Sequence, residues 1–392
     1  MKENSNNNIN LRMNKSIAVL FLIILFAICI INIFTKDKQY SESENRMLQQ
    51  KPVLTTSSIE NGRFMDEYDS YKSDQFFGRN FWVRLKANIE LLSGKRDSNG
   101  IFKGKNNYLL EDIAKPDEEF LNKNLESIKS FQNKHSDIPM YMMLVPNAAN
   151  IMSDKLPAFA VTADQNSYIE SVKTSLGDCI NWIDVTSVLQ SHSDEDIYYH
   201  TDHHWTTLGA YYAFQELSKK MELDLSSYPS LKPFAVTDSF NGTLSSNSGY
   251  ETGYKEPIYI YAPEKTEDIS SVIVNYVDEK EKTTTLYDQS KLDSKDKYAV
   301  FLGGNHSKID IKTTSGSTNK LLVIKDSYAN CFIPFLVPYY REIIVIDPRY
   351  FYDDIETIIT QNSISDVLFL YNCNTFLKDN SLNGVLETIE TE

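Results

Sequence analysis

The sequence predicts an α/β fold: a parallel sheet with flanking helices and a β-rich insertion, preceded by one N-terminal transmembrane helix. Three observations predict it. Short apolar runs alternate with helical patterns over residues 321–370, a further apolar run of strand length covers residues 138–145, and residues 17–34 form an uncharged apolar run. The first two are typical of buried parallel strands, and the third has the length of a membrane span.

The C-terminal alternation defines the sheet most clearly. Strands are expected at residues 321–325, 342–346 and 366–370, with helices at residues 328–340 and 352–361. This β–α–β–α–β order is typical of parallel strands joined by helices that cover the sheet. Ligands of such sheets bind beyond the carboxyl ends of the strands, so the residues that follow each strand are candidates for a site.

Upstream segments extend the same architecture. Residues 116–134 and 166–176 have helical patterns, and residues 138–145 and 179–185 are expected to be strands. The strand at residues 138–145 ends at Pro146-Asn147, which places a loop at its carboxyl end.

Two further segments are interpreted as β structure. Residues 100–110 are expected to form a hairpin with its turn at residues 104–107. Residues 222–320 hold alternating or β-branched runs that clusters of charged residues and serine separate. This pattern predicts a β-rich insertion between two parts of one α/β core.

The N-terminal apolar run is expected to anchor the chain in the cytoplasmic membrane. Lys2, Arg12 and Lys15 precede it, whereas lysines and acidic residues balance one another beyond it. The positive-inside rule leaves the N-terminus in the cytoplasm and sends the remainder outside. A cleaved signal peptide is the alternative, although its apolar core is usually shorter and no clear small-x-small site follows Phe34. The expected order is a cytoplasmic tail (1–16), an anchor (17–34), a tether (35–58) and an extracytoplasmic domain (59–392) that includes the insertion.

Composition excludes some classes of function. The 392 residues carry a formal net charge of −15, with 54 acidic and 39 basic residues, and no basic stripe is present. Such a surface repels phosphate backbones, so nucleic acid is not an expected partner. Cys29 lies in the apolar run, and the three cysteines beyond it allow at most one intramolecular disulfide. A buried core rather than a disulfide framework must therefore stabilise the fold.

A histidine motif is the clearest chemical signal. The run YYHTDHHWTTLGAYY at residues 198–212 holds three of the six histidines, with Asp202 among them. In an extended or turning segment, residues two apart point to the same side, so Asp202 is expected to pair with His204 while His203 points away. A carboxylate fixes which nitrogen of a histidine carries the proton, and histidine exchanges protons near neutral pH. The motif must precede a helix that Thr206 or Thr207 caps.

Two other interpretations of the motif stay open. A cluster of histidine and aspartate beside aromatic residues is compatible with a buried hydrogen-bond network. The same residues also suit zinc or iron. No cysteine or glutamate lies within the motif to complete such a site, so we expect an acid–base dyad without a metal or other cofactor.

Ser327 is the expected nucleophile. It follows the strand at residues 321–325 and opens a helix, which exposes its hydroxyl and places backbone N–H groups where negative charge develops. Ser327, His204 and Asp202 together provide the nucleophile, base and orienting carboxylate of acyl transfer. Asn372, beyond the last strand, is the first candidate for an oxyanion donor. A simple helix cap is the alternative role for Ser327.

At these residues the chain resembles a family. TDHHW at residues 201–205, with KDSYAN at residues 325–330, resembles the bacterial DHHW proteins. These are similar to the SGNH-hydrolase-like alginate O-acetylation proteins, in which a short Asp-x-His-Trp motif precedes the serine block in a circularly permuted order. The resemblance spans residues 42–375 and includes ENR at residues 44–46 and FLGGN at residues 301–305.

The resemblance implies a fold and a function. It implies an SGNH-hydrolase-like, circularly permuted domain in which Asp202 and His204 form the dyad and Ser327 is the nucleophile. Two features depart from SGNH enzymes: Lys325 stands where glycine usually precedes Asp-Ser, and no GxND block is present. The implied activity is O-acetylation of an exopolysaccharide or cell-wall glycan outside the membrane, and a polytopic membrane-bound O-acyltransferase partner would bring the acetyl groups across. An acetyl esterase and a non-catalytic scaffold of a polysaccharide assembly complex are the alternatives.

Overall fold

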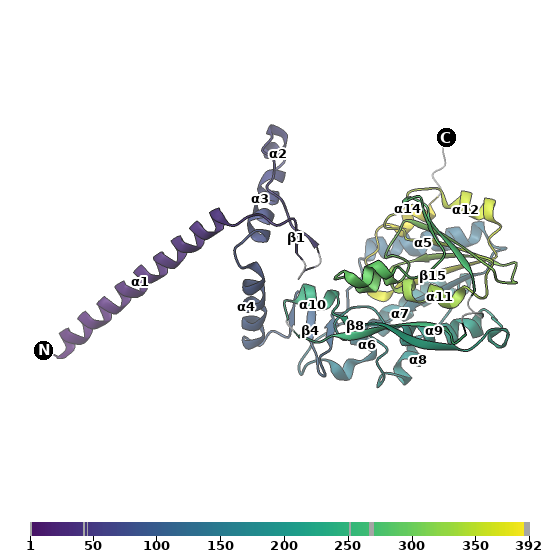
Figure 1. Cartoon of the computed structure of the whole chain (residues 1–392), viewed down its shortest axis with the longest axis horizontal. Coiled ribbons are helices and arrows are strands. Elements are labelled where there is room, and N and C mark those ends of the chain that lie inside the picture. Colours follow the sequence, from purple (N-terminus) through teal and green to yellow (C-terminus); the bar gives the residue numbers. More distant parts are fainter. Residues whose placement is uncertain (1, 42–43, 45, 251, 266–269, 388–392) are drawn as a thin grey trace. The chain divides into compact units, whose positions relative to one another are not determined.

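The computed structural model describes residues 2–41, 44, 46–250, 252–265 and 270–387. The chain divides into two compact units, residues 1–89 and residues 90–392 (Figure 1). Each unit is described by itself.

The first unit is built from helices. Its long N-terminal helix contains the candidate membrane span Met13–Phe34, which has 22 residues and a mean hydropathy of 3.2. Among the described residues, one helix is long and apolar enough to cross a membrane, and it is this one. The elements are α1 (Lys2–Phe34), β1 (Tyr40–Ser41), β2 (Arg46–Met47), α2 (Thr56–Glu60), α3 (Arg63–Asp74) and α4 (Arg79–Leu92), the last of which continues into the second unit.

Ion pairs around the buried carboxylate of Asp74 hold the turns of this unit together. Asp74, at the end of α3, pairs with Arg46 at 2.5 Å and accepts the Gln49 N–H at 2.8 Å. Glu44 pairs with Arg46 at 2.8 Å and with Arg79 at the start of α4. The motif ENR thus contributes Glu44 and Arg46 to a structural ion network, while Asn45 lies outside the described residues.

An eight-stranded mixed sheet forms the centre of the second unit. Its strand order is β11-β10-β12-β14-β13-β15-β6-β7. The five strands from β14 to β7 are parallel, which confirms the predicted parallel sheet, whereas β12, β10 and β11 extend it antiparallel. The strands are β6 (Met140–Val145), β7 (Asn181–Trp182), β10 (Val272–Tyr276), β11 (Glu281–Thr283), β12 (Lys308–Thr313), β13 (Lys320–Lys325), β14 (Glu342–Ile346) and β15 (Asp366–Asn372).

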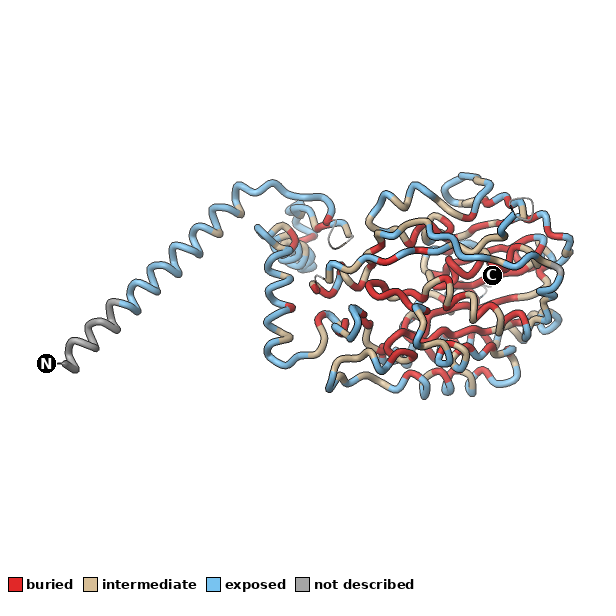
Figure 2. The backbone as a smooth tube through the Cα atoms, turned by 60° about the horizontal axis from the view of Figure 1, so that its bottom comes forward, coloured by how far each residue is buried: buried red, intermediate tan, exposed pale blue. Residues whose placement is uncertain are grey.

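Helices cover both faces of this sheet. Because side chains alternate along a strand, each central strand contributes to two apolar clusters. Leu322 and Ile324 of β13 pack on one face with α5, α7, α12 and α14, whereas Leu321 and Val323 pack on the other face with α8, α9 and α11. Figure 2 shows the buried residues, in red, gathered in the middle of this unit. The helices are α5 (Glu118–Lys134), α7 (Gln165–Leu176), α8 (Thr186–Ser191), α9 (Thr207–Lys220), α11 (Ile333–Leu336), α12 (Ile355–Asn362) and α14 (Leu382–Leu386).

Smaller elements complete the unit. The predicted hairpin is present as two antiparallel strands of a three-stranded sheet. Within residues 222–320, two strands form a separate antiparallel pair, whereas β10, β11 and β12 join the central sheet. The remaining elements are β3 (Asp97–Ser98), β4 (Ile101–Lys103), β5 (Leu109–Glu111), α6 (Ala148–Ile151), β8 (Leu231–Phe240), α10 (Thr243–Ser248), β9 (Glu256–Pro263) and α13 (Cys373–Phe376).

Two segments differ from the sequence prediction. In place of one helix over residues 328–340, the chain forms a 3₁₀ helix, η7 (Ser327–Cys331), and then the short α11. Pro334 lies in the first turn of α11, and proline there cannot continue a preceding helix because it lacks an N–H. The strand expected at residues 179–185 is reduced to the two residues of β7.

Candidate active site

Ser327 lies at the carboxyl edge of the parallel strands. β13 ends at Lys325, and Ser327 opens η7 and is half-buried. The carboxylate of Asp326, which is buried, accepts the N–H of Tyr328 at 2.9 Å and that of Asn372 at 2.9 Å. Asp326 therefore joins the turn after β13 to the end of β15. Asp326 also accepts the hydrogen bond of the Tyr328 N–H. This N–H is one of the first backbone N–H groups after Ser327, which the sequence analysis expected to face developing negative charge.

The histidine motif forms a turn directly before α9. An isolated antiparallel bridge joins Tyr198 to Trp205, and Thr206 caps α9 through the Gly209 N–H at 3.3 Å. Within this turn Oδ1 of Asp202 lies 2.5 Å from Nδ1 of His204 and accepts the His204 backbone N–H at 3.1 Å. The two residues are paired as their spacing predicts. The expectation that His203 points away is wrong, because its Nδ1 lies 3.7 Å from Oδ1 of Asp202 and its ring centroid lies 3.9 Å from that of His204.

His204 connects this turn to Ser327. Its Nε2 lies 2.8 Å from Oγ of Ser327, so a continuous hydrogen-bonded chain runs from Asp202 through His204 to Ser327. Asp202 and His204 are buried, with exposed fractions of 2% and 5%. A carboxylate on Nδ1 favours the tautomer whose Nε2 accepts a proton from the serine. The arrangement is chemically suited to forming and breaking an ester on Ser327.

The electrostatics of the pair suit a neutral base. Burial and the His203 ring lower the pKa of His204 to about 4, although the Asp202 carboxylate acts in the opposite direction. Burial acts to raise the pKa of Asp202, but the His203 and His204 rings and the hydrogen bonds that the carboxylate accepts lower it well below its usual range. Near neutral pH, Asp202 is therefore ionised and His204 is neutral.

The ring of Tyr298 holds the imidazole in place, and Trp205 ties the histidine motif to the turn after β13. The ring of Tyr298 stacks on His204 with centroids 3.8 Å apart and an interplanar angle of 12°, and its hydroxyl donates to the Ser327 carbonyl at 3.2 Å. Trp205 Nε1 donates to the carbonyl of Tyr328 at 2.9 Å. Sequence analysis missed Tyr298, because it lies in the 3₁₀ helix η6 (Lys297–Val300) inside the segment interpreted as a β-rich insertion.

Contacts from the start of α10 fix the Asp202 carboxylate. Its Oδ2 accepts the Thr243 N–H at 2.7 Å. A Cβ atom added to Gly242 would lie 2.3 Å from the Cβ of Asp202, so any larger residue there must displace Asp202. Glu256 accepts the Thr201 N–H at 2.9 Å and the Thr201 hydroxyl at 2.6 Å, and the Gly242 N–H donates to the same hydroxyl at 2.9 Å. The turn and the start of α10 are thereby locked together.

A metal site is the alternative interpretation of this turn. Asp202, His203 and His204 each place one ligand atom within 4.8 Å of the others. However, both ring nitrogens of His204 already have partners, Asp202 and Ser327. A metal bound at Nδ1 would replace the carboxylate contact, so the hydrogen-bonded chain and a metal site involving His204 are mutually exclusive.

Asn372 takes part in a buried amide network. Its side-chain nitrogen donates to the carbonyl of Val145 at 3.3 Å and to Oδ1 of Asn147 at 3.2 Å. In the described part of the chain, no hydrogen bond joins the Asn372 side chain to Ser327. The structure therefore places Asn372 at the expected sheet edge, and its role as an oxyanion donor stays a prediction.

Lys325 stands where a glycine was expected from the resemblance. It is fully buried, and its Nζ contacts Oδ1 of Asn305 at 3.0 Å and Oδ2 of Asp347 at 3.3 Å. Asn305 also accepts from Nδ2 of Asn330 at 3.1 Å. The lysine thus connects β13 to the FLGGN loop, whose residues Leu302, Gly303 and Gly304 have positive φ angles.

Comparisons with known proteins give the family and related folds. The family model described as DHHW protein matches residues 126–346. A crystal structure of a DHHW family protein from Eubacterium siraeum is similar at 24% identity and TM-score 0.63, covering 73% of this chain and 95% of that one. Bacillus cereus PatB1, solved with a sulfonyl adduct, is similar at 19% identity and TM-score 0.60, covering 73% and 97% of the two chains. No curated protein matches the sequence.

Proposed function

The chain belongs to the DHHW family, and from that premise we propose that it is a membrane-anchored, extracytoplasmic O-acetyltransferase. It would acetylate an exopolysaccharide or cell-wall glycan through an acetyl-serine intermediate on Ser327. The proposed fold of its outer domain is SGNH-hydrolase-like and circularly permuted. The observation that carries the proposal is the chain of hydrogen bonds from Asp202 through His204 to Ser327.

The first step forms the acetyl-enzyme. Nε2 of His204 accepts the hydroxyl proton of Ser327 while Oγ attacks the acetyl carbonyl carbon. The tetrahedral intermediate collapses as the bond to the donor oxygen breaks, and His204 returns the proton to that leaving group. Asp202 stabilises the imidazolium and does not itself take a proton.

The second step transfers the acetyl group. A sugar hydroxyl donates its proton to His204 and attacks the acetyl-serine carbonyl carbon. The bond from this carbon to Oγ of Ser327 then breaks, and His204 returns the proton to Oγ. Each tetrahedral intermediate needs donors for its oxyanion. Asn372 is the proposed side-chain donor, and to act it must exchange its hydrogen bond to Val145 or to Asn147.

The proposed location follows from the N-terminal helix. With the span of α1 in the cytoplasmic membrane and the N-terminus inside, the second unit lies outside the cell. Glycan acceptors are present there, whereas cytosolic acetyl donors are not. A polytopic membrane-bound O-acyltransferase partner would supply acetyl groups, and the glycan is the acceptor. The net charge of −15 favours a neutral glycan over a polyanion.

PatB1 adds independent support for a nucleophilic side chain in this fold. That protein is described with a sulfonyl adduct, and sulfonyl reagents attach to activated nucleophiles. If Ser327 is activated as proposed, a sulfonyl fluoride will modify this chain once, and Ser327→Ala will resist modification.

An acetyl esterase is the second candidate function. Ser327 is half-buried rather than fully enclosed, so water can reach the acyl-enzyme and take the place of the sugar hydroxyl. The two activities share the first step and differ in the acceptor. A non-catalytic scaffold, in contrast, would form no acyl-enzyme at all.

Product analysis separates transfer from hydrolysis. We would incubate the full chain in detergent with p-nitrophenyl acetate and neutral oligosaccharides, and follow acetylated sugar by mass spectrometry. A transferase yields acetylated oligosaccharide that is absent with Ser327→Ala and present with Ser191→Ala, an exposed serine on α8. Free acetate with no acetylated sugar from any acceptor would replace the transferase by the esterase.

A further inference from the structure

The first unit carries an apolar stripe that nothing in the proposed chemistry uses. On α4, positions 81, 82, 85 and 89 fall on one side of the helix, because steps of three and four residues return to the same face. Large apolar residues exposed to this degree on one helix face mark an interaction surface. Their exposed fractions are 57% for Phe81, 40% for Trp82, 37% for Leu85 and 55% for Ile89, and the preceding Phe76 and Phe77 are 39% and 45% exposed.

Hydrogen bonds place this stripe at the outer end of the membrane span. The backbone N–H of Phe77 donates to Oδ1 of Asn32 at 2.7 Å, and Asn32 is in the last turn of α1. Trp82 Nε1 donates to the Phe77 carbonyl at 3.1 Å. Trp82 also packs edge-on against Phe81, with ring centroids 5.2 Å apart. The aromatic cluster is therefore tied to the position where α1 leaves the apolar layer.

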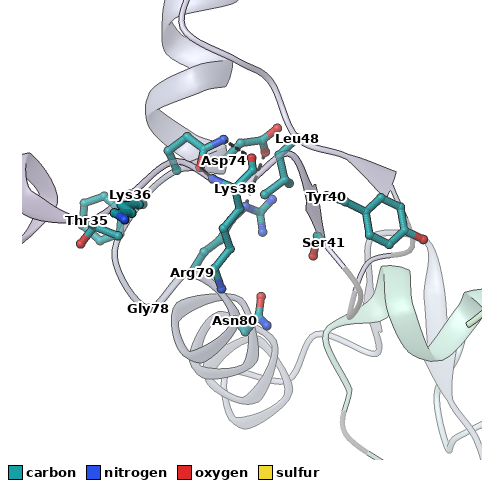
Figure 3. A pocket seen from close by; sticks show the side chains of 12 residues that line it. Thr35, Lys36, Lys38, Tyr40, Ser41, Leu48, Asp74, Gly78, Arg79 and Asn80 are labelled. Carbon is teal, nitrogen blue, oxygen red and sulfur yellow. Dashed lines mark hydrogen bonds and ion pairs between the residues drawn. The ribbon is translucent and has the colours of Figure 1, made fainter.

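The charges around this junction suit lipid headgroups. A cavity of about 560 Å³ lies between the end of α1 and the start of α4 (Figure 3). Lys36 and Lys38 line it, together with Asp74 and Arg79, which belong to the ion network with Glu44 and Arg46. A second cavity of about 810 Å³ beside α3 is lined by lysines and tyrosines. Aromatic residues and lysines gather where a protein meets the membrane–water interface. The lysines and tyrosines that line the second cavity are Lys36, Lys51, Lys72, Tyr68 and Tyr71. One acidic residue, Asp37, lines it as well and accepts the Tyr71 hydroxyl at 3.0 Å.

We propose that α4 lies in the outer membrane–water interface, with its apolar stripe among the upper acyl chains and the adjoining lysines among the headgroups. The lipid bilayer is the partner that these features favour, because the stripe is fixed to the end of the span and mixes aromatic and aliphatic residues on one face. This inference rests on the proposed membrane anchorage.

Depth-dependent fluorescence quenching tests the proposal. The full chain is reconstituted in phosphatidylcholine and phosphatidylglycerol vesicles with lipids brominated near the headgroup or near the chain end. The sequence has three tryptophans, so shallow bromines should remove roughly a third of the emission, and deep bromines less. The quenching should vanish in Trp82→Phe and persist in Trp182→Phe, whose tryptophan lies in β7 of the central sheet.

A second variant and two controls keep the result interpretable. Replacing both Leu85 and Ile89 with serine leaves Trp82 in place and should reduce its quenching at least twofold. Quenching that does not depend on Trp82, or that survives the double variant unchanged, would overturn the proposal and leave the stripe to a protein partner. Loss of the chain from vesicles on carbonate washing would instead disprove the anchorage. The acetyl-enzyme assay, in which Trp82→Phe should match the unmodified chain, reports separately on the proposed function.

Discussion

Replacing Gly242 with alanine tests whether the position of the Asp202 carboxylate controls His204. The added Cβ would lie 2.4 Å from Oδ2 and 2.8 Å from Cγ of Asp202. To reach an ordinary contact of 3.4 Å, the carboxylate must retreat by about 1 Å. That movement breaks the 2.7 Å bond from the Thr243 N–H and disturbs the 2.5 Å contact with Nδ1 of His204.

We expect the substitution to lower kcat strongly while the protein stays folded. A displacement of about 1 Å at a catalytic group costs about 10²-fold in rate, and complete loss of an orienting aspartate costs about 10⁴-fold, so kcat should fall between these limits. KM should change little, because Asp202 contacts the base rather than the substrate. Overpacking costs about 1–3 kcal/mol in the free energy of unfolding, which leaves the protein folded.

The assay is p-nitrophenyl acetate turnover beside a thermal unfolding curve. Gly316→Ala is the matched control, because an added Cβ there meets no atom within 4 Å, and it should keep the unmodified rate. A folded Gly242→Ala variant with kcat within twofold of the unmodified chain would refute the reasoning that Asp202 orients the base.

Three further predictions concern the same chain of residues. Because the pKa of His204 is lowered to about 4, acylation should accelerate as pH rises through about 4 and be flat from about pH 6 to 8, whereas a rate midpoint near 6.5 would show an unperturbed histidine. Tyr298→Phe keeps the ring stacked on His204 and loses the hydroxyl's contacts with the Ser327 carbonyl and Cys331, so its kcat should fall about fivefold. In Tyr298→Ala the kcat should fall about 10²-fold or more, and equal losses would contradict a stacking role. Dialysis against EDTA should leave acylation unchanged, and stoichiometric zinc or iron whose removal abolishes it would replace the dyad by a metal site.

The sequence contains enough to predict the parallel part of the sheet and the relation between Asp202 and His204. Strand–helix alternation determines the first, and the two-residue spacing in an extended turn determines the second. It also places Ser327 at the edge of the sheet, since serine follows the apolar strand directly. The contact of 2.8 Å between His204 and Ser327 joins residues 123 positions apart and follows only from the assembled fold.

Other features depend on tertiary contacts that carry no local pattern. Tyr298, Gly242 and Glu256 all lie within residues 222–320, where alternation predicts strands but gives no indication of which side chains meet the motif. The amide of Asn372 is at the predicted edge, yet its bonds to Val145 and Asn147 depend on a neighbouring strand. Prolines within residues 328–340 divide the predicted helix, an effect that the apolar spacing alone does not reveal.

The central claim is that Ser327 becomes acetylated with His204 as its base. The most direct measurement is the intact mass of the full chain after brief exposure to p-nitrophenyl acetate at pH 7. The account predicts one adduct of about 42 Da, the mass of one acetyl group on a serine nucleophile. The adduct should be absent in Ser327→Ala and His204→Ala and retained in His135→Ala, whose histidine caps α5 on the opposite side of the sheet. An adduct that persists in Ser327→Ala, or forms at the unmodified rate in His204→Ala, would contradict it.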